Sequence, residues 1–526
     1  MPRKNKNQPP REPEIATNLR LLEMAYGGEC VARLNNTTTN TSDKLPDNPV
    51  IEEIDQTVAK EAKPLPPEQT SNPNQVVFVA GGLPGEVVEA QLYRRKKSYL
   101  RGNVLKITEP SPVRQEAPCP YFGVEKWPNC GGCQWQHAQY DAQLAFKASI
   151  LRDQLIRLGG IENPPLLGPV GARSGWGYRN NVELQIDRNT GRPCYHRQNS
   201  IRLVPVESCH IAHPLINLAI EPLGAALNKY LPGKVHQVTI RVGPVSRDMS
   251  ISAEEITTLA PYSQNEAARL KVLEHLAQAE TAQRPALLFI LRMLGQADLQ
   301  PFVEEMQTAL GHYASLTIVG EGKKRRLEVL GGLPYLEEVL DGVTYRVPPL
   351  AFFQSNSPMA EELVVQVFEA FAAAGLELRG TRLLDIFCGV GTFSLQLARW
   401  GAKVLGIEEY EGAVQAANEN ALLNQLENLA SFVAARAEEY ILQLEEEGQV
   451  FDAVLLDPPR RGCEPALLES LLKTRPPVIV YVSCDPSTLA RDLKLLSPGY
   501  RLVQARTVDL FPQTYHMESV SLLKAK

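Results

Sequence analysis

The chain has 526 residues, of which 44% are hydrophobic and 22% are charged, and its formal net charge is -6. This length is enough for about three globular domains. The apolar runs are short and broken by charged residues, which excludes a readable membrane-spanning helix. No apolar segment follows the basic N-terminus, so we expect a cytoplasmic protein with no membrane association. The acidic net charge argues against a protein that coats nucleic acids nonspecifically.

Basic residues are instead concentrated locally, at residues 94–97 with Arg101 and at residues 323–326. Such clusters can bind phosphate groups, although a solvated charged face is the more common explanation for each. The nine cysteines are too few for a disulfide framework. In a reducing compartment, clustered cysteines more often bind metals or act as nucleophiles.

The N-terminal part has the composition of a tail followed by a small β-barrel. Residues 1–16 are polar and rich in proline, which is typical of a disordered tail. Short β-type runs at residues 17–34 and 75–108, with a Gly-Gly-Leu-Pro-Gly turn, predict a small β-barrel over residues 17–110. Residues 35–74 are rich in Asn, Thr and Pro, and we expect a flexible insertion there.

The rest of the chain divides by pattern into two regions. Residues 111–345 carry mixed strand and helix patterns, which predict a central α+β region. Residues 346–526 alternate short apolar strands with helices. This alternation implies a parallel, doubly wound, Rossmann-like sheet. The predicted fold class is therefore α/β, with an N-terminal barrel and a central α+β region.

A glycine loop in the C-terminal region suits a nucleotide-like cofactor. Residues 385–394, Asp-Ile-Phe-Cys-Gly-Val-Gly-Thr-Phe-Ser, close a strand and open a helix, and the glycines let a ligand approach the backbone. Glu408 ends the next strand, where a carboxylate can accept both ribose hydroxyls of an adenosine. Ser394 stands where a dinucleotide fingerprint has its third glycine. The loop therefore indicates S-adenosylmethionine rather than NAD, with an ordinary tight turn as the alternative.

Two polar turns follow two later strands. Asp457 begins Asp-Pro-Pro-Arg-Arg-Gly, and Cys484 precedes Asp-Pro. Both lie at the carboxyl ends of parallel strands, where such folds place their active sites. The Asp-Pro-Pro turn is rigid and presents polar groups to a flat ring. We expect Cys484 to be an exposed nucleophile whose pKa a nearby positive charge lowers, with a buried structural cysteine as the alternative.

A candidate general base lies near the C-terminus. His516 and Glu518 are two residues apart on an extended segment and therefore share one face. A carboxylate in a pocket can act as a general base. From spacing alone, a solvent-exposed glutamate on an edge strand is an equally good interpretation.

Four cysteines form a candidate metal cage. Cys130-Gly-Gly-Cys133 is a tight two-ligand knuckle that Cys119 and Cys209 can complete, and four thiolates suit either Zn²⁺ or an iron–sulfur cluster. The C-x3-C-x2-C pattern of radical S-adenosylmethionine enzymes is absent, which favours a structural or RNA-contacting role. Unrelated thiols are the alternative.

Together, these motifs resemble the RNA uracil-5-methyltransferases, in particular the iron–sulfur type that acts on 23S ribosomal RNA. The likeness spans the chain except for residues 1–16 and 35–74. Residues 24–33 with 77–86 are similar to that family's TRAM barrel, an OB-like RNA-binding module, and residues 130–137 with Gln143 and Lys147 are similar to its cluster region. Residues 178–180 resemble a further family segment. Residues 352–356 resemble the segment with a cofactor-binding Gln and a base-stacking Phe.

The resemblance implies a role for each candidate residue. A [4Fe-4S] cluster is expected on Cys119, Cys130, Cys133 and Cys209. The S-adenosylmethionine and uracil sites are expected to include Gln354, Phe387, Glu408 and Asp457. Cys484 is expected to attack C6 of a uracil, and Glu518 to remove the C5 proton after methylation. The partner is RNA whose target base is flipped out of its stack, and we expect a monomeric enzyme.

Three departures from the family pattern stand out. Ten residues separate Cys119 from Cys130, where five are usual, Asp485 replaces a common Asn, and Arg436 stands where some relatives have a polar cofactor ligand. Three other functions stay open: a transfer-RNA uracil-5-methyltransferase, an RNA cytosine-5 methyltransferase that uses Cys463 as a second cysteine, and a non-catalytic RNA-binding factor.

Overall fold

The computed structural model describes residues 14–34, 75–96, 98–123, 129–244, 286–310, 315–321 and 327–526. The expected insertion at residues 35–74, residues 1–13 of the expected tail and the basic cluster at residues 323–326 lie outside the described residues. The chain divides into two units, residues 1–143 and 144–526. Within the described ranges, no helix has the length and apolar character needed to span a membrane.

The first unit contains the expected barrel. Its strands close in the order β1-β2-β3-β5-β4. They are β1 (Glu14–Met24), β2 (Cys30–Arg33), β3 (Val76–Ala80), β4 (Val87–Lys96) and β5 (Tyr99–Glu109). Buried and partly exposed residues alternate along the first six residues of β5, as expected for a strand with one face toward a barrel interior. The first strand begins at Glu14, so residues 14–16 belong to the barrel rather than to the tail.

The second unit begins at Leu144, about one turn into α2 (Tyr140–Arg157). It contains an α+β region, as the mixed pattern predicts. A seven-stranded sheet has the order β12-β11-β10-β9-β6-β7-β8, and a two-stranded sheet pairs β13 with β14. The strands are β6 (Asn181–Ile186), β7 (Pro193–His196), β8 (Leu203–Pro205), β9 (Val235–Gly243), β10 (Ala286–Met293), β11 (Ser315–Glu321), β12 (Leu327–Gly331), β13 (Leu336–Leu340) and β14 (Val343–Val347). The helices α3 (Pro214–Tyr230) and α6 (Gln300–Leu310) pack on each other and on this sheet.

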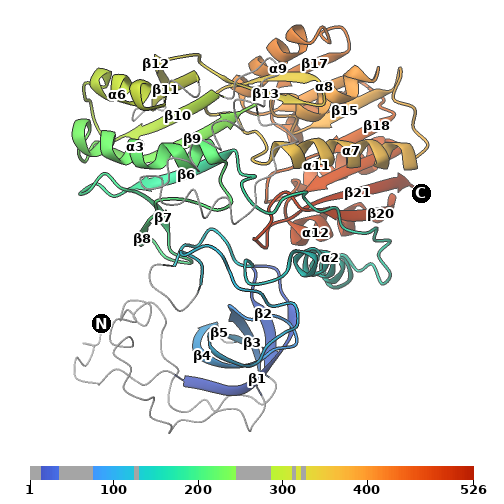
Figure 1. Ribbon diagram of the computed structural model, residues 1–526. Helices are drawn as coiled ribbons and strands as arrows, with labels where there is room; N and C mark the ends of the chain where they lie inside the picture. Colours follow the sequence, from blue (N-terminus) through green and yellow to red (C-terminus); the bar gives the residue numbers. More distant parts are fainter. Residues whose placement is uncertain are drawn as a thin grey trace, which may run out of the picture. The chain divides into compact units, whose positions relative to one another are not determined.

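A second seven-stranded sheet lies at the C-terminal end and has the order β17-β16-β15-β18-β19-β21-β20 (Figure 1). Its strands are β15 (Arg382–Ile386), β16 (Lys403–Glu408), β17 (Ala430–Ala434), β18 (Ala453–Leu456), β19 (Val478–Ser483), β20 (Tyr500–Val508) and β21 (Glu518–Ala525). Its helices are α7 (Ser357–Ala373), α8 (Thr392–Arg399), α9 (Glu411–Leu423), α10 (Ala437–Glu446), α11 (Pro465–Thr474) and α12 (Pro486–Leu496). This is the Rossmann-like domain that the sequence predicts.

The sheet is parallel, as the alternation of strands and helices predicts, except at its last two strands. The strands β15 to β19 pair in parallel, whereas β21 pairs antiparallel with both β19 and β20. Only residues 509–517 separate β20 from β21, which is too short for the crossover helix that a parallel connection needs. The resulting hairpin inserts β21 between β19 and β20.

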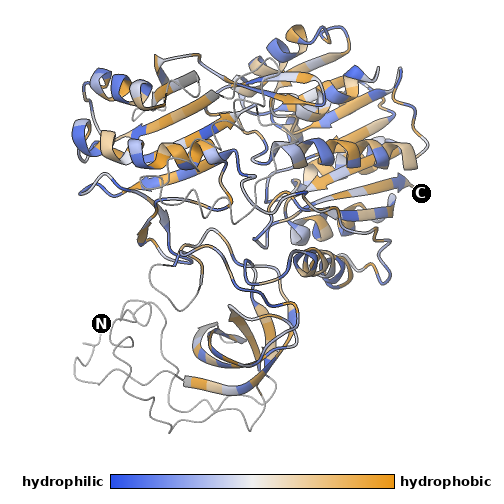
Figure 2. Cartoon of the chain, viewed as in Figure 1, coloured by the Kyte–Doolittle hydropathy of each residue, from blue (hydrophilic) through white to orange (hydrophobic). Residues whose placement is uncertain are grey.

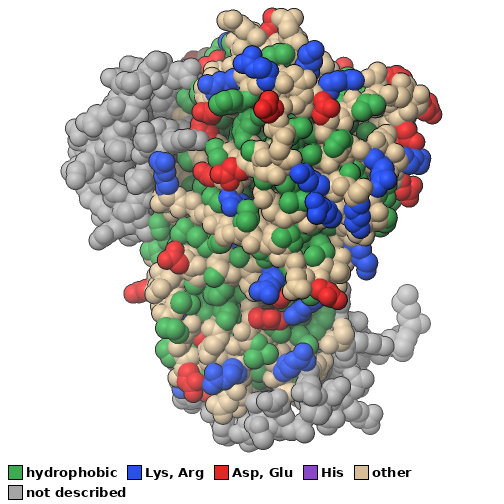
Figure 3. Space-filling model, turned by 90° about the vertical axis from the view of Figure 1, so that its right-hand side faces the viewer, with side chains coloured by type: hydrophobic (Ala, Val, Ile, Leu, Met, Phe, Trp, Pro, Cys, Tyr) green, Lys and Arg blue, Asp and Glu red, His purple; other side chains and the backbone are tan. Residues whose placement is uncertain are grey.

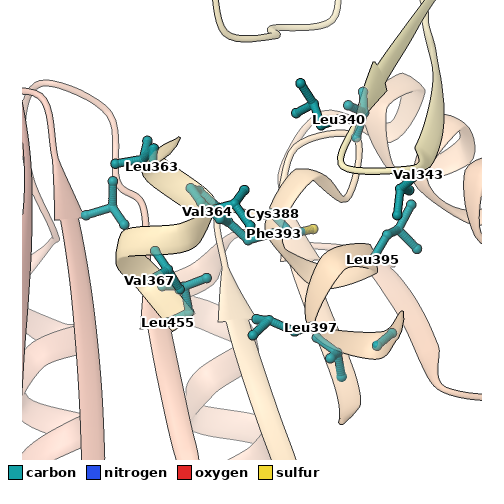
Figure 4. Close-up of a cluster of buried hydrophobic side chains, with 14 of the residues drawn as sticks. Leu340, Val343, Leu363, Val364, Val367, Cys388, Phe393, Leu395, Leu397 and Leu455 are labelled. Carbon is teal, nitrogen blue, oxygen red and sulfur yellow. The ribbon is translucent and has the colours of Figure 1, made fainter. Parts of the chain in front are cut away.

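The core of this domain lies directly beneath the glycine loop. Every residue of β18 and β19 is buried, as expected for central strands covered on both faces. Figure 2 shows the same strands as predominantly hydrophobic. Side chains of α7, the glycine loop and α8 meet in one buried cluster that includes Val364, Cys388 and Phe393 (Figure 4). This packing fixes the loop on a rigid base.

Candidate active site

The glycine loop adopts a backbone that few residues tolerate. Phe387, just after β15, has a φ of 73°, and Gly391, the N-cap of α8, has a φ of 86°. A Cβ at Gly391 would lie 3.1 Å from the Phe432 ring, so a larger residue would be strained in two ways. Non-glycine residues in the left-handed region occur most often where function requires them. The amides of Phe387 and Cys388 both donate to the carbonyl of Ile407, which ties the loop to β16.

Glu408 lies at the mouth of this loop, where the sequence predicts it. Its Oε2 accepts a hydrogen bond from the Gly389 amide at 3.2 Å, and its Oε1 accepts one from the Tyr410 amide at 2.9 Å. The side chain is half-buried. The carboxylate is therefore held in one orientation but remains accessible to a ligand.

Two buried oxygens of the predicted motifs, one on Asp385 and one on Gln354, lack hydrogen-bond partners among the described residues. Asp385 is fully buried, and its Oδ2 accepts from Ser394 Oγ at 2.5 Å, whereas Oδ1 has no partner. Burial, together with the Glu408 carboxylate, raises the pKa of Asp385 to about 7. Gln354 is also buried, with an unpartnered Oε1, and its backbone carbonyl accepts from Asn180 Nδ2. Unsatisfied buried acceptors are costly, so these atoms fit a ligand that donates hydrogen bonds.

Cys484 and Glu518 come from adjacent strands of the sheet. The pairing of β19 with β21 includes Ser483 opposite Ser519, so the next residues outward are Cys484 and Glu518. Ser519 Oγ donates to the carbonyl of Ser483 at 3.1 Å, which fastens the two strand ends together. Asp485 caps α12 directly after Cys484, because its Oδ1 accepts from the amides at the start of that helix. The short Asp-Pro turn therefore has a structural role.

The surroundings of Cys484 differ from the prediction. The thiol is partly exposed, but burial and the carboxyl groups of Glu518 and Asp457 raise its pKa to about 12. Arg460 acts in the opposite direction without prevailing. The expected lowering of the Cys484 pKa by a nearby positive charge is therefore present, but acidic neighbours and desolvation outweigh it, so the net shift is upward.

Glu518 is 5% exposed, which rules out the solvent-exposed edge glutamate that the spacing allowed. Its strand lies inside the sheet, between β19 and β20. Burial, followed by the Asp457 carboxylate, raises the pKa of Glu518 well above its usual value. The group therefore holds a proton more tightly than an ordinary glutamate does.

Asp457 connects the glycine loop with the Cys484–Glu518 pair. Burial and the Asp385 carboxyl group raise its pKa to about 7. Its charge acts in turn on Cys484 and Glu518. Arg460, three residues later in the same turn, places Nη2 3.5 Å from His516 Nδ1. The structure thus gathers four of the predicted residues, Glu408, Asp457, Cys484 and Glu518, into one electrostatically coupled region.

Sequence reasoning did not assign Asp385 and Arg460 to the site. Both belong to motifs that it singled out, the glycine loop and the Asp-Pro-Pro turn. The usable signal for Asp385 was an acidic residue in a buried strand directly before the loop. Cys463, the possible second cysteine, is buried, and its thiol contacts the Tyr481 hydroxyl at 3.7 Å. That position disfavours it as a second nucleophile.

The four candidate cage cysteines differ from the buried ones. All four are partly exposed, whereas Cys30, Cys194, Cys388 and Cys463 are buried. Cys119, Cys130 and Cys133 belong to the first unit and Cys209 to the second. The Gly132 amide donates to Cys130 Sγ at 3.3 Å, a contact that suits a thiolate ligand. No group of three metal-ligating side chains is gathered among the described residues, so the cluster stays a prediction.

Comparisons with known proteins identify similar sequences and a similar structure. The family model described as tRNA (Uracil-5-)-methyltransferase matches residues 296–526. Proteins named uncharacterized RNA methyltransferase are similar in Thermosynechococcus vestitus, with 34% identity over 86% of this chain and 93% of that protein, and in Bacillus cereus, with 30% identity over 85% and 92%.

One solved structure is similar over most of the chain. It is the Pyrococcus abyssi tRNA (uracil-54, C5)-methyltransferase in complex with S-adenosyl-L-homocysteine. The TM-score is 0.60 and the identity 26%, over 85% of this chain and 94% of that one. The extent and identity of these matches establish that the chain belongs to the RNA uracil-5-methyltransferase family of S-adenosylmethionine-dependent enzymes.

Proposed function

We propose that this protein methylates C5 of a specific uridine in 23S ribosomal RNA, with Cys484 as the covalent nucleophile and Glu518 as the general base. One observation carries the proposal: Cys484 and Glu518 occupy adjoining strand ends, beside the Asp457 turn and the glycine loop. A thiol, a buried carboxyl group and a cofactor loop at one edge of a sheet suit transfer to a flat ring.

The residues around the glycine loop fit S-adenosylmethionine. When bound, it supplies a methyl group on a positively charged sulfur. Gln354, Phe387, Glu408 and Asp457 are the residues that we assign to hold it and the uracil. The unpartnered oxygens of Asp385 and Gln354 can accept hydrogen bonds from the donor groups of this cofactor. The solved relative that contains S-adenosyl-L-homocysteine supports this assignment.

Cys484 and Glu518 then perform complementary steps. The Cys484 thiolate adds to C6 of the uracil, and the electron pair of the C5–C6 double bond moves toward O4 as an enolate. The enolate makes C5 nucleophilic enough to take the methyl group. Glu518 removes the proton from C5, the double bond re-forms, and the C6–sulfur bond breaks to return the electron pair to Cys484. Asp457 can fix the edge of the ring by hydrogen bonding.

Recognition of the RNA would combine stacking with local charge. Phe352 is 71% exposed and lies two residues before Gln354, so its ring is available to a base. On the face drawn in Figure 3, Lys and Arg side chains are interspersed with acidic and apolar ones. Arg101 of the barrel is itself paired with Glu29 at 3.3 Å. We therefore expect shape and stacking to matter more than a broad basic surface.

We also propose a [4Fe-4S] cluster on Cys119, Cys130, Cys133 and Cys209. Support comes from the all-thiolate donor set and from the amide of Gly132 directed at Cys130 Sγ. The assignment of ribosomal rather than transfer RNA rests on the same sequence resemblance. The solved relative acts on transfer RNA, according to its name, so transfer RNA is the competing substrate.

The decisive experiment identifies the methylated nucleoside. Purified protein is incubated with methyl-labelled S-adenosylmethionine and, separately, with protein-free 23S ribosomal RNA and transfer RNA, and the RNA is then digested. We expect label in 5-methyluridine from ribosomal RNA. Label in 5-methyluridine from transfer RNA only would contradict the proposed ribosomal RNA substrate but agree with the proposed reaction. Label in 5-methylcytidine, or no label from either RNA, would overturn the proposed reaction. The Cys484→Ser variant is the control and should transfer no label.

A further inference from the structure

The loop that leads to Glu518 is buried, which is unusual for a connection between strands. Residues 509–517 join β20 to β21, and the pairing of Val508 with Glu518 closes the hairpin. The side chains of Leu510, Thr514 and Met517 are at most 1% exposed. Loops generally lie at the surface because their backbone groups need partners. A buried loop must find those partners within the protein.

Three consecutive carbonyls of this loop receive their hydrogen bonds from side chains of distant segments. Asn356 Nδ2 donates to the carbonyl of Leu510 at 2.9 Å, and Lys147 Nζ donates to that of Phe511 at 3.0 Å. The Tyr178 hydroxyl donates to the carbonyl of Pro512 at 3.0 Å. These donors lie 154 to 364 residues away from their acceptors in the sequence. The path of the loop is thus set from outside the hairpin.

Lys147 binds the loop at a second point. Its ammonium group lies 2.5 Å from Asp509 Oδ1, and both side chains are 1% exposed. Asp509 Oδ1 also accepts from the Phe511 amide at 3.0 Å. A buried ion pair of this kind is weak support for stability, because desolvation offsets the attraction, but its geometry is demanding. It therefore fixes the first turn of the loop in one conformation.

The same donors belong to segments that the sequence analysis singled out, although the proposed reaction gives these three side chains themselves no role. Tyr178 precedes Asn180, whose Nδ2 donates to Ser357 Oγ at 2.7 Å. Asn356 caps α7, with its Oδ1 accepting from the Met359 amide, while its Nδ2 holds the loop. One side chain thus connects the segment with Gln354 to the segment that ends at Glu518.

We propose that Lys147, Tyr178 and Asn356 are positioning residues, which together hold the 509–517 loop so that the Glu518 carboxyl group stays against Cys484. The inference rests on the proposed function and extends it. A buried carbonyl that loses its donor is costly, so the loop moves to satisfy it. Glu518 then moves with the loop, and removal of the C5 proton slows while the covalent bond to C6 persists.

Two variants test the inference with little disturbance. Tyr178→Phe removes only a hydroxyl group, and Asn356→Ser retains a good helix cap but is too short to reach Leu510. The matched control is Tyr500→Phe, since the Tyr500 hydroxyl is also buried and also donates to backbone carbonyls, those of Leu471 and Pro476. Hydrogen exchange of residues 509–517 is measured by mass spectrometry, beside steady-state methylation kinetics and the amount of detergent-stable protein–RNA adduct.

We expect both variants to lower kcat by about tenfold, to raise the adduct level and to speed amide exchange in the loop, with KM for S-adenosylmethionine unchanged. The Tyr500→Phe control should match the wild type in all four measurements. Wild-type kcat and wild-type loop exchange in both variants would overturn the inference, as would a changed KM with unchanged kcat. If wild type and control both fail to methylate RNA, the proposed function has failed, and loop exchange alone then decides whether the Tyr178 and Asn356 side chains hold the loop.

Discussion

The carboxyl group of Glu518 raises the pKa of the Cys484 thiol, because the two residues lie at adjoining ends of the paired strands β19 and β21. The effect acts together with burial and with Asp457, and it brings the pKa of Cys484 to about 12. At neutral pH only a small fraction of Cys484 is thiolate in the protein alone. A thiol that is mostly protonated is a slow nucleophile. Cys484 should therefore react readily only with a substrate that changes the surroundings of the thiol.

The Asp457→Asn substitution should therefore have opposite effects on two reactions of Cys484. Asp457 titrates near pH 7 and is charged at pH 8, so its removal lowers the pKa of Cys484. We expect alkylation of Cys484 by iodoacetamide at pH 8, mapped by mass spectrometry, to become several-fold faster. Methyl transfer should fall, because Asp457 also orients the uracil. Unchanged alkylation would show that the charge of Asp457 does not reach the thiol.

The pH dependence of kcat/KM should rise steadily through the neutral range. Cys484 and Glu518 act in their deprotonated forms, and both have raised pKa values. As pH increases, more of each group is deprotonated, so activity grows, and it is lost as pH falls. Because kcat/KM reports the free enzyme, we expect an increase of at least about tenfold per pH unit from pH 7 to 9, since Cys484 alone contributes about tenfold per unit below its pKa. A maximum below pH 7 would contradict this assignment of the two groups.

Much of this site could be predicted from the order of strands and turns. The carboxyl ends of parallel strands meet at one edge, so Glu408, Asp457 and Cys484 could be placed together without a structure. The proximity of Glu518 could not, because it depends on the antiparallel insertion of β21 between β19 and β20. The short gap of residues 509–517, which has no room for a crossover helix, is the sequence signal for that hairpin, but it does not show between which strands β21 inserts.

Other features depend on pairings that sequence does not encode locally. The Lys147 and Asp509 side chains are 362 residues apart, and each alone reads as an ordinary surface charge. The pKa of Cys484 is raised partly because several acidic groups lie near its thiol in the folded chain. The spacing of these residues along the sequence does not show that they come together. The barrel was predictable because its β-type runs at residues 17–34 and 75–108 include a Gly-Gly-Leu-Pro-Gly turn between two short strands, even though a long insertion separates the runs.

The Asp385→Asn substitution should stabilise the ligand-free protein above neutral pH. Asp385 has a pKa raised from 3.8 to about 7, so the folded state binds more protons than the unfolded state within that range. Stability therefore falls as pH rises from about 4 to about 7. The variant lacks this loss, and its melting temperature should exceed that of the wild type at pH 8 but not at pH 4. The difference is measured by thermal unfolding, and a constant offset at all pH values would contradict it.

The Phe352→Ala substitution should weaken RNA recognition without weakening the fold. Phe352 is 71% exposed, so its removal leaves no cavity. Stacking of an aromatic ring on a base contributes about 1–3 kcal/mol, so kcat/KM for RNA should fall by about 5- to 150-fold. The control is Trp400→Ala, an aromatic residue that is 61% exposed elsewhere on the domain. Equal losses in both variants would indicate a general surface effect, and an unchanged kcat/KM in Phe352→Ala would remove the ring from the RNA site.

Substitution of the partly exposed cysteines should separate cluster ligands from structural thiols. Protein purified without oxygen should be brown and contain about four iron atoms per chain, and Cys130→Ser or Cys209→Ser should lose most of this iron. Cys194→Ser is the matched control, since Cys194 is buried and its thiol donates to the backbone carbonyl of Arg192. Colourless protein with bound zinc would keep the four-thiolate site but replace its metal. Equal iron loss in the control would mean that the colour depends on folding rather than on ligation.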